Sequence, residues 1–242
     1  MNYENIKQFL DNYGRDNVVF CYGNNAVVDM IKNLVISANS VRLDVVVFAL
    51  DEMVFKAMNG LCDVVKYFDG KTSPDKFYKC GTHDFRNAVW QCWLIGNEIL
   101  LSGRSYIYMD VDIVVKENFE EDVFQQFGGD DDCVIQFNGK NACAGFYSLM
   151  PTVRTVDLFT LRFLEAHEHK MYSDDQLFFN RIIYKCGRLN VKFLDRDEYP
   201  NGKHYYENHE RIDGLCKIIH FNGIRGYETK VDKMKEHNYW SI

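Results

Sequence analysis

Residues 105–115, SYIYMDVDIVV, decide the fold of this chain. A nearly unbroken apolar run, 105–109, meets Asp110-Val111-Asp112 and then three β-branched residues, 113–115. The run 105–109 predicts a strand, and the nearly unbroken, β-branched run 43–50 is typical of a parallel strand that is covered by helices on both faces. Because ligands of open α/β sheets bind at the carboxyl ends of the strands, the two aspartates stand where a binding site is expected.

Further apolar runs predict more strands, and 3–4 spacing of apolar side chains predicts helices between them. The expected strands cover 18–22, 43–50, 63–68, 133–138, 144–149 and 217–220; the expected helices cover 27–38, 53–60, 85–100, 119–127, 152–169 and 174–186. Residues 70–81 are typical of a loop, and the last 15 residues of a charged helix or tail. Without repeats or linkers, we expect one α/β domain over residues 1–242, with a mainly parallel central sheet flanked by helices.

The composition excludes several classes of function. Twenty-eight basic against 35 acidic residues give a net charge of -7, which argues against a nucleic-acid binder. No stretch approaches eighteen uncharged apolar residues, so no membrane span is expected, and residues 1–5 lack the pattern of a signal peptide. The eight cysteines form no Cys-x-x-Cys pair. We expect reduced, mostly buried thiols and a cytoplasmic protein.

Asp110 and Asp112 interrupt an apolar stretch, where two carboxylates would be costly to bury without a partner. A metal ion is the most economical partner, and oxygen ligands select hard cations such as Mg²⁺ or Mn²⁺. The alternative is a turn with two exposed carboxylates.

His220 stands at the end of a late strand and is a candidate to complete such a site, because neutral imidazole binds Mn²⁺. Gly223 and Gly226 would let backbone amides approach a phosphate closely. Lys230 could supply a charge to a diphosphate. The alternative for His220 is a structural histidine.

Two further segments allow two interpretations each. Ser173 or Asp174 can cap the helix that they open, or Asp175 and Gln176 can face a sugar. Residues 141–146 can line a pocket wall or form a tight turn. The acidic run 130–132 is typical of a solvated turn.

In order and spacing, these motifs resemble the metal-dependent glycosyltransferases of the Rossmann-like GT-A fold. The resemblance is strongest to the nucleotide-diphospho-sugar transferase group that includes plant rhamnogalacturonan xylosyltransferases and small viral and microbial enzymes. It extends from Val18 to about Lys230 and rests on 18–22, 48–52, 103–112, 144–146, Asp175-Gln176 with Asn180, and His220-x-Asn222 with Gly226 and Lys230.

The resemblance implies a role for each matched position. The implied metal ligands are Asp110, Asp112 and His220, with Asp110 contacting the metal or the ribose. The implied nucleotide and diphosphate contacts are Tyr22, Gly23, Asp51, Asn222, Gly223, Gly226 and Lys230. Asp175 and Gln176 would face the donor sugar and the reacting centre. Such families often carry a lysine near Gln91 or Cys92, and Arg86 is the candidate to replace it here.

The implied activity is transfer of a sugar from a nucleotide-diphosphate donor, favoured as UDP, to a glycan or glycoprotein hydroxyl, with Mn²⁺ or Mg²⁺ and with retention. An inverting enzyme would need a general base, for which Asp174 or Asp175 could serve. Two other functions stay open at this point: a metal-dependent nucleotidyltransferase, and a non-catalytic module that binds sugar nucleotides. The reduced cysteines favour a cytoplasmic viral or microbial enzyme over a Golgi enzyme.

Overall fold

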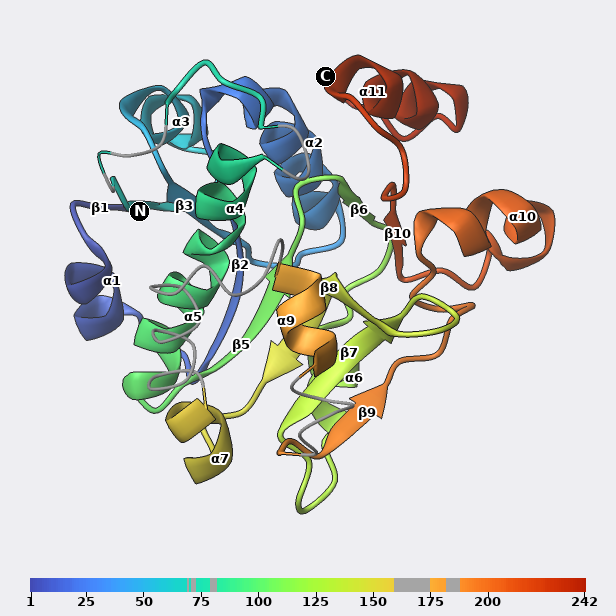
Figure 1. Ribbon diagram of the computed structural model, residues 1–242. Helices are drawn as coiled ribbons and strands as arrows, with labels where there is room; N and C mark the ends of the chain where they lie inside the picture. The colour runs from blue at the N-terminus through green and yellow to red at the C-terminus, as the bar shows by residue number, and fades with distance from the viewer. Residues whose placement is uncertain (69, 71–72, 79–81, 159–174, 182–187) are drawn as a thin grey trace.

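A computed structural model describes residues 1–68, 70, 73–78, 82–158, 175–181 and 188–242. The chain forms an α/β fold in which helices lie on both faces of an eight-stranded sheet (Figure 1). The strand order is β1-β4-β3-β2-β5-β8-β7-β9. The strands are β1 (Asn2–Tyr3), β2 (Asn17–Gly23), β3 (Val46–Ala49), β4 (Asp63–Lys66), β5 (Ser105–Met109), β7 (Cys133–Phe137), β8 (Ala142–Leu149) and β9 (Val191–Phe193).

The five strands from β1 to β5 in this order run parallel, and β7 and β9 are also parallel to each other. Only β8 pairs antiparallel with both of its neighbours, β5 and β7. The mainly parallel sheet predicted from the apolar runs is therefore confirmed.

Successive strand residues point to opposite faces of the sheet, so β2 presents apolar side chains on both faces and helices cover each of them. Phe20 and Val18 pack in one core with α1 (Ile6–Asn12), α5 (Gln91–Leu101) and α9 (Asp175–Arg181). Val19 and Cys21 pack in the other with α2 (Val28–Ser40), α3 (Glu52–Met58) and α6 (Glu120–Gln125). Among the described residues before α9, the other helical segments are η1 (Asn25–Val27), α4 (His83–Val89) and α7 (Val153–Asp157).

A second, two-stranded sheet positions the carboxyl-terminal part of the chain. β6 (Ile113–Val115) pairs antiparallel with β10 (Ile218–His220), so that His220 stands opposite Ile113. α10 (Gly202–Ile212) and α11 (Tyr227–Glu236) lie beside this sheet, on the right of Figure 1. The pairing therefore brings His220 next to the acidic pair of the β5–β6 connection.

The structure corrects several details of the sequence interpretation. The helix predicted over 85–100 is two helices, α4 and α5, which meet at Trp90. β1, α1, β9 and α10 were not predicted. Most of the helix predicted over 152–169 and parts of the one over 174–186 lie outside the described residues. No described helix has the length and apolarity that crossing a membrane requires.

Candidate functional site

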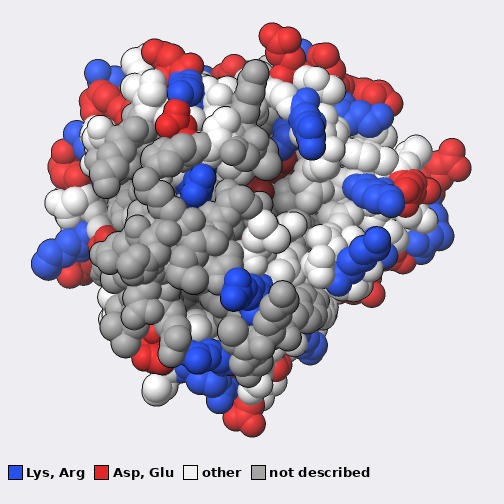
Figure 2. Space-filling view, viewed as in Figure 1, with Lys and Arg blue, Asp and Glu red and all other residues white. Residues whose placement is uncertain are grey.

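A cavity of about 180 Å³ opens at the carboxyl ends of β2 and β5. Its lining combines apolar and aromatic side chains with three charged ones: Tyr22, Gly23, Asn24, Val27, Met30, Leu50, Phe77, Tyr78, Phe85, Ala88, Val89, Tyr108, Asp110, Val111, Asp112 and Lys230. Figure 2 shows a hollow on this face of the molecule, with acidic surface deep inside it and Lys and Arg side chains to its right. The cavity therefore lies where ligands of α/β sheets bind.

Three of the predicted site residues converge beside this cavity. One ligand atom from each of Asp110, Asp112 and His220 lies within 4.8 Å of the other two. Nε2 of His220 is 3.2 Å from Oδ1 of Asp112 and 3.4 Å from Oδ2 of Asp110. Asp112 and His220 are 3% and 1% exposed, whereas Asp110 is partly open to solvent. The alternative of a turn with two exposed carboxylates is therefore wrong for Asp112.

Backbone and side-chain hydrogen bonds hold the acidic pair in place. The backbone N–H of Asp110 donates to the carbonyl oxygen of Gly145 at 2.7 Å. The Tyr108 hydroxyl donates to Oδ1 of Asp110 at 2.5 Å, which leaves Oδ2 for the cluster. The N–H of Phe221 donates to the carbonyl oxygen of Asp112 at 2.9 Å and ties β10 to the acidic turn.

Two observations show that the cluster fits a divalent cation. Nε2 of His220 is buried and makes no hydrogen bond with any residue that the structure describes, although it faces two carboxylates. Such an orphaned nitrogen is costly unless something else binds it. A Cβ on Gly145 would lie 2.3 Å from the His220 ring and 2.4 Å from Oδ2 of Asp110, so the glycine leaves this space clear. Carboxylate oxygens and imidazole nitrogens are both common ligands of divalent cations.

Charges within the cluster shift the pKa of its members. Burial alone would lower the pKa of His220, but the negative charge of Asp112 outweighs it and holds the pKa well above its usual range. Burial would raise the pKa of Asp112, but the charges of Lys230 and His220 hold it far below its usual range. Lys230 pairs with Oδ2 of Asp112, on the oxygen that does not face His220. In this state positive groups therefore flank the Asp112 carboxylate on both oxygens.

The residues behind His220 form a second set of contacts. Nδ1 of His220 is 2.8 Å from Oε1 of Gln136, which is fully buried. Sγ of Cys143 is 3.8 Å from the same nitrogen and accepts a hydrogen bond from Nδ2 of Asn222 at 3.3 Å. Oδ1 of Asn222 also accepts from the N–H of Gly202 at 2.8 Å. Asn222 thus lies beside the cluster, where it links α10 to β8.

Of the nucleotide contacts that the resemblance implies, Tyr22, Gly23 and Lys230 line the cavity together with both aspartates. The Tyr22 ring is stacked on Tyr108 with centroids 5.8 Å apart. Gly223 and Gly226 adopt positive φ angles of 77° and 96°, and Gly226 precedes α11, which carries Lys230.

Asp51 and Arg86 do not line this cavity. Asp51 is a buried N-cap: Oδ1 accepts from the N–H of Val54 at 2.9 Å and Oδ2 from the N–H of Asn25 at 2.6 Å. Arg86 lies on α4, and Phe85, Ala88 and Val89 are the residues of that helix that reach the cavity. The roles that the resemblance implies for Asp51 and Arg86 stay predictions.

Asp175 and Gln176 open α9, and Oδ1 of Asp175 accepts from the N–H of Gln176 at 2.8 Å. After burial and the charge of Cys92, the charge of Asp175 also raises the pKa of Tyr22, a residue of the cavity lining. Their implied catalytic roles remain predictions. Asp174 lies outside the described residues.

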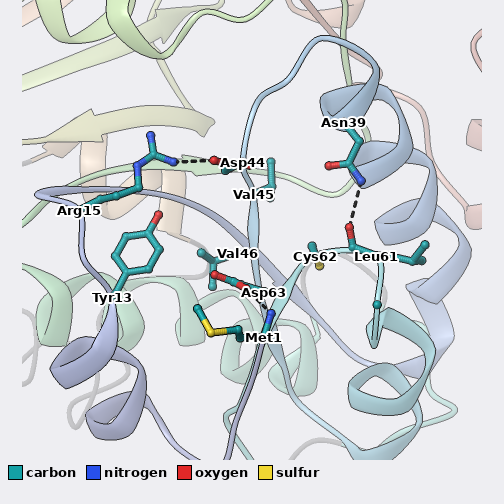
Figure 3. Close-up of a pocket in the computed structure, with 11 residues that line it drawn as sticks. Met1, Tyr13, Arg15, Asn39, Asp44, Val45, Val46, Leu61, Cys62 and Asp63 are labelled. Atoms are coloured by element: carbon teal, nitrogen blue, oxygen red, sulfur yellow. Dashed lines mark hydrogen bonds and ion pairs between the residues drawn. The ribbon is translucent and has the colours of Figure 1, made fainter.

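A second cavity, of about 380 Å³, lies at the opposite ends of the strands, near their amino termini (Figure 3). Arg15, Asp44 and Asp63 line it near the amino ends of β2, β3 and β4. The charged groups among its described lining residues are paired: Arg15 with Asp44 at 3.0 Å, and the amino group of Met1 with Asp63. Within that lining, this cavity therefore offers no unpaired charge to a nucleotide.

Sequence reasoning missed Gln136 and Asn24 as parts of the site, whereas Cys143 belongs to residues 141–146, for which a pocket wall was one of the two interpretations. Gln136 reads as the polar member of an alternating strand, and only its full burial distinguishes it. Asn24 precedes η1, but its side chain makes no cap hydrogen bond and instead donates to the carbonyl oxygens of Ser73 and Lys76. Those contacts depend on the loop that forms the cavity wall, which no local pattern predicts.

Comparison with known proteins identifies similar chains. The pattern of the nucleotide-diphospho-sugar transferase family matches residues 41–234. A UDP-galactose:fucoside alpha-3-galactosyltransferase of Dictyostelium discoideum is 28% identical over 188 residues, 67% of this chain and 29% of that protein. A UDP-D-xylose:L-fucose alpha-1,3-D-xylosyltransferase of Arabidopsis thaliana, MGP4, is 26% identical over 174 residues, 60% of this chain and 47% of that protein.

The chain thus spans less than half the length of either curated relative. The crystal structure of the glycosyltransferase GlyE of Streptococcus pneumoniae TIGR4 matches with a TM-score of 0.60 and 12% identity, covering 94% of this chain and 60% of that one. At this identity the match shows a shared fold, which agrees with the predicted GT-A architecture.

Proposed function

Since the chain belongs to the nucleotide-diphospho-sugar transferase family, we propose that it is a metal-dependent glycosyltransferase that moves one sugar from a nucleotide-diphosphate donor to a hydroxyl group of a glycan or glycoprotein. One observation carries the proposal. The lining of one cavity divides into apolar side chains, such as Val27 and Met30, and the charged groups of Asp110, Asp112 and Lys230. A nucleoside diphosphate has the same division into a flat base and an anionic end.

The proposed donor is a UDP-sugar, with Mn²⁺ or Mg²⁺ as the cofactor. The two curated relatives are named as a UDP-galactose and a UDP-xylose transferase, which supports a hexose or a pentose as the transferred sugar. The mixed oxygen and nitrogen ligands favour Mn²⁺ over Mg²⁺.

The proposed reaction breaks the bond between the anomeric carbon and the diphosphate oxygen, which keeps the bonding electron pair, and forms a bond from that carbon to the acceptor oxygen, whose proton passes to the departing diphosphate. A bound divalent cation would supply Lewis-acid charge to the leaving diphosphate. Lys230, which lines the cavity and pairs with Asp112, adds a positive charge there. Asp175 and Gln176 would face the sugar, where a carboxylate and an amide dipole stabilise positive charge on the anomeric carbon. We propose retention of configuration, with Asp174 or Asp175 as the base if the enzyme inverts instead.

A product assay tests the proposal against its alternatives. The full chain is incubated with Mn²⁺ and a panel of nucleotide sugars, and the released nucleotide is identified by chromatography. Release of a nucleoside diphosphate supports the glycosyltransferase. Release of pyrophosphate from nucleoside triphosphates would instead support a nucleotidyltransferase, and binding of Mn²⁺ and UDP without turnover would support a non-catalytic module.

We propose the cytoplasm of a microbial cell, or of a host cell if the source is a virus, as the place of action. Support comes from the six described cysteines, Cys21, Cys62, Cys92, Cys133, Cys143 and Cys216, which are all free thiols. Reducing compartments keep cysteines in this form. Detection of a disulfide between any of these six in protein isolated from its source would contradict this location.

A further inference from the structure

Gln136 lies next to the candidate metal cluster of Asp110, Asp112 and His220. It contacts Nδ1 of His220, whereas Nε2 of the same ring faces Asp112. Its side chain is fully buried on β7. The pairing of β7 with β8 shifts register between Ile135 and Gln136. Such bulges re-aim one side chain of a strand. Gln136 is thereby placed between the carbonyl oxygen of Tyr199 and Nδ1 of His220.

The hydrogen bonds of the Gln136 amide fix which of its two atoms faces His220. Nε2 of Gln136 donates to the carbonyl oxygen of Tyr199 at 3.0 Å. A carbonyl oxygen only accepts, so the NH₂ group must face Tyr199 and the oxygen Oε1 must face His220. Oε1 carries no proton, and its 2.8 Å contact with Nδ1 therefore requires a proton on Nδ1.

A neutral imidazole with its proton on Nδ1 carries its lone pair on Nε2. This is the nitrogen that faces Asp110 and Asp112 at 3.4 and 3.2 Å. We infer that Gln136 is a positioning residue that holds His220 in the tautomer whose Nε2 can coordinate a divalent cation. The inference rests on the metal site of the proposed function and assigns a task to a residue outside the three ligands.

Cys143 is the other described group near Nδ1, and it does not replace Gln136. Its sulfur lies 3.8 Å away, against 2.8 Å for the amide oxygen, and already accepts a hydrogen bond from Asn222. Thiols are also weak acceptors. Removing the oxygen of Gln136 therefore leaves Nδ1 without a strong partner among the described residues, and nothing then fixes the tautomer or the angle of the ring.

The test measures the affinity of the full chain for Mn²⁺ by calorimetry in Gln136→Leu and Gln136→Glu. The leucine variant keeps the size of the side chain but lacks the acceptor, and we expect 10- to 100-fold weaker binding. The glutamate variant keeps an oxygen that can accept from Nδ1 of His220, the role that carboxylates often fill behind metal-binding histidines. We expect that variant to bind Mn²⁺ within about threefold of the wild type, as the conservative rescue.

Ser148→Ala is the matched control. Ser148 is also fully buried in the same sheet, and its hydroxyl donates to the carbonyl oxygen of Tyr106 at 2.8 Å. Its loss should lower the thermal midpoint without changing the Mn²⁺ affinity. If Gln136→Leu changes only the thermal midpoint, as Ser148→Ala does, Gln136 is structural and the inference is overturned.

A second measurement reads the tautomer directly and does not depend on how the variants fold. ¹⁵N spectra of the histidine rings in the Mg²⁺-saturated wild type should show His220 protonated at Nδ1 and not at Nε2. Protonation at Nε2 instead would overturn the inference while the proposed function stands. If the wild type binds neither Mn²⁺ nor Mg²⁺, the metal dependence of the proposed function fails, and the inference fails with it.

Discussion

No side chain fits between Gly145 and His220. A Cβ atom on Gly145 would lie 2.3 Å from Cε1 of His220 and 2.4 Å from Oδ2 of Asp110. Gly145 is not among the glycines with positive φ, so the backbone itself would accept another residue. The close approach of His220 and Asp110, and not the backbone conformation, therefore requires glycine here, and β8 borders the candidate site together with the acidic turn.

Gly145→Ala tests whether the site can be disrupted while the protein still folds. We expect at least tenfold weaker Mn²⁺ binding, because the new methyl group forces His220 and Asp110 apart, and a loss of about 1–3 kcal/mol in the free energy of unfolding from overpacking. Calorimetry and urea unfolding measure the two quantities. Gly14→Ala, where a Cβ would meet nothing within 4 Å, is the control and should change neither. Unchanged Mn²⁺ affinity in Gly145→Ala would contradict the metal site described here.

Asp112→Ala should abolish metal-dependent release of the nucleoside diphosphate and also the stabilisation by metal. At Mn²⁺ concentrations of about 100 times the dissociation constant, binding to the folded wild type adds about 2.7 kcal/mol to its free energy of unfolding. For a chain of this size, that raises the midpoint of thermal unfolding by roughly 5–10 °C. We expect no such rise in the variant. Asp29→Ala, which removes an exposed carboxylate 3.6 Å from Lys32, should keep it. Full turnover of Asp112→Ala would refute the assignment.

Lys230→Met tests how much the positive charge of Lys230 contributes to the binding of a diphosphate. Lys230 lines the cavity beside Asp112, so its loss should weaken UDP binding by about 10- to 100-fold in the presence of Mn²⁺, the range expected for one charged contact. Uridine lacks the diphosphate, and its affinity should stay the same. Lys233→Met on the same helix, which removes an ion pair with Glu236, is the control. Equal losses for UDP and uridine would mean that Lys230 does not act on the diphosphate.

The predictable part of this fold is the part encoded locally. The strands β2, β3 and β5 can each be predicted from their own apolar residues, and the acidic pair after β5 can be recognised in the same way. The pairing of β10 with β6 brings His220 to Asp112. This strand pairing is a long-range contact that the sequence pattern did not predict; ligand chemistry and the resemblance suggested that His220 joins the acidic pair, but neither gave the pairing that brings it there.

The missed elements have physical reasons. β9 is three residues long with partly or fully exposed side chains, so burial left no pattern in it. α10 is polar, with apolar contacts only along one narrow face. The periodicity of apolar residues continues across Trp90, which hides the break between α4 and α5. Gln136 was missed because a buried glutamine and a solvent-facing one look the same in a strand.

Cys62 should be slow to alkylate in the folded protein. Burial, and then the charge of Asp63, raise the pKa of its thiol to about 12. Only the thiolate reacts, so at pH 8 we expect alkylation at least about 100-fold slower than in the denatured chain, whose cysteines have ordinary pKa values near 8.5. The rate should rise about tenfold per pH unit from roughly pH 7 to 10. Peptide mapping by mass spectrometry follows this residue, and a plateau near pH 9 in the folded protein would contradict the raised pKa.

Asn180 holds α9, and with it Asp175 and Gln176, against the strand that forms the site. Oδ1 of Asn180 accepts from the N–H of Ala142 at 2.9 Å, and its Nδ2 donates to the carbonyl oxygen of the same residue at 3.0 Å. Both bonds go to the first residue of β8, three positions before Gly145. A shift of α9 would therefore move the proposed sugar-facing groups relative to the metal cluster.

We expect Asn180→Ala to lower the rate of nucleoside diphosphate release at least tenfold, because displacements of about 1 Å at a reacting centre cost up to 100-fold in rate. Its affinity for Mn²⁺ and UDP should stay within about twofold, since none of the metal ligands contacts Asn180. Asn33→Ala is the matched control: its amide makes the same two kinds of backbone contact, to Tyr239 and Ser241, away from the cavity. Both variants should lose about 1–3 kcal/mol in stability, but only Asn180→Ala should lose rate. Equal rates in the two variants would show that α9 takes no part in the reaction and would remove the support for Asp175 as a catalytic group.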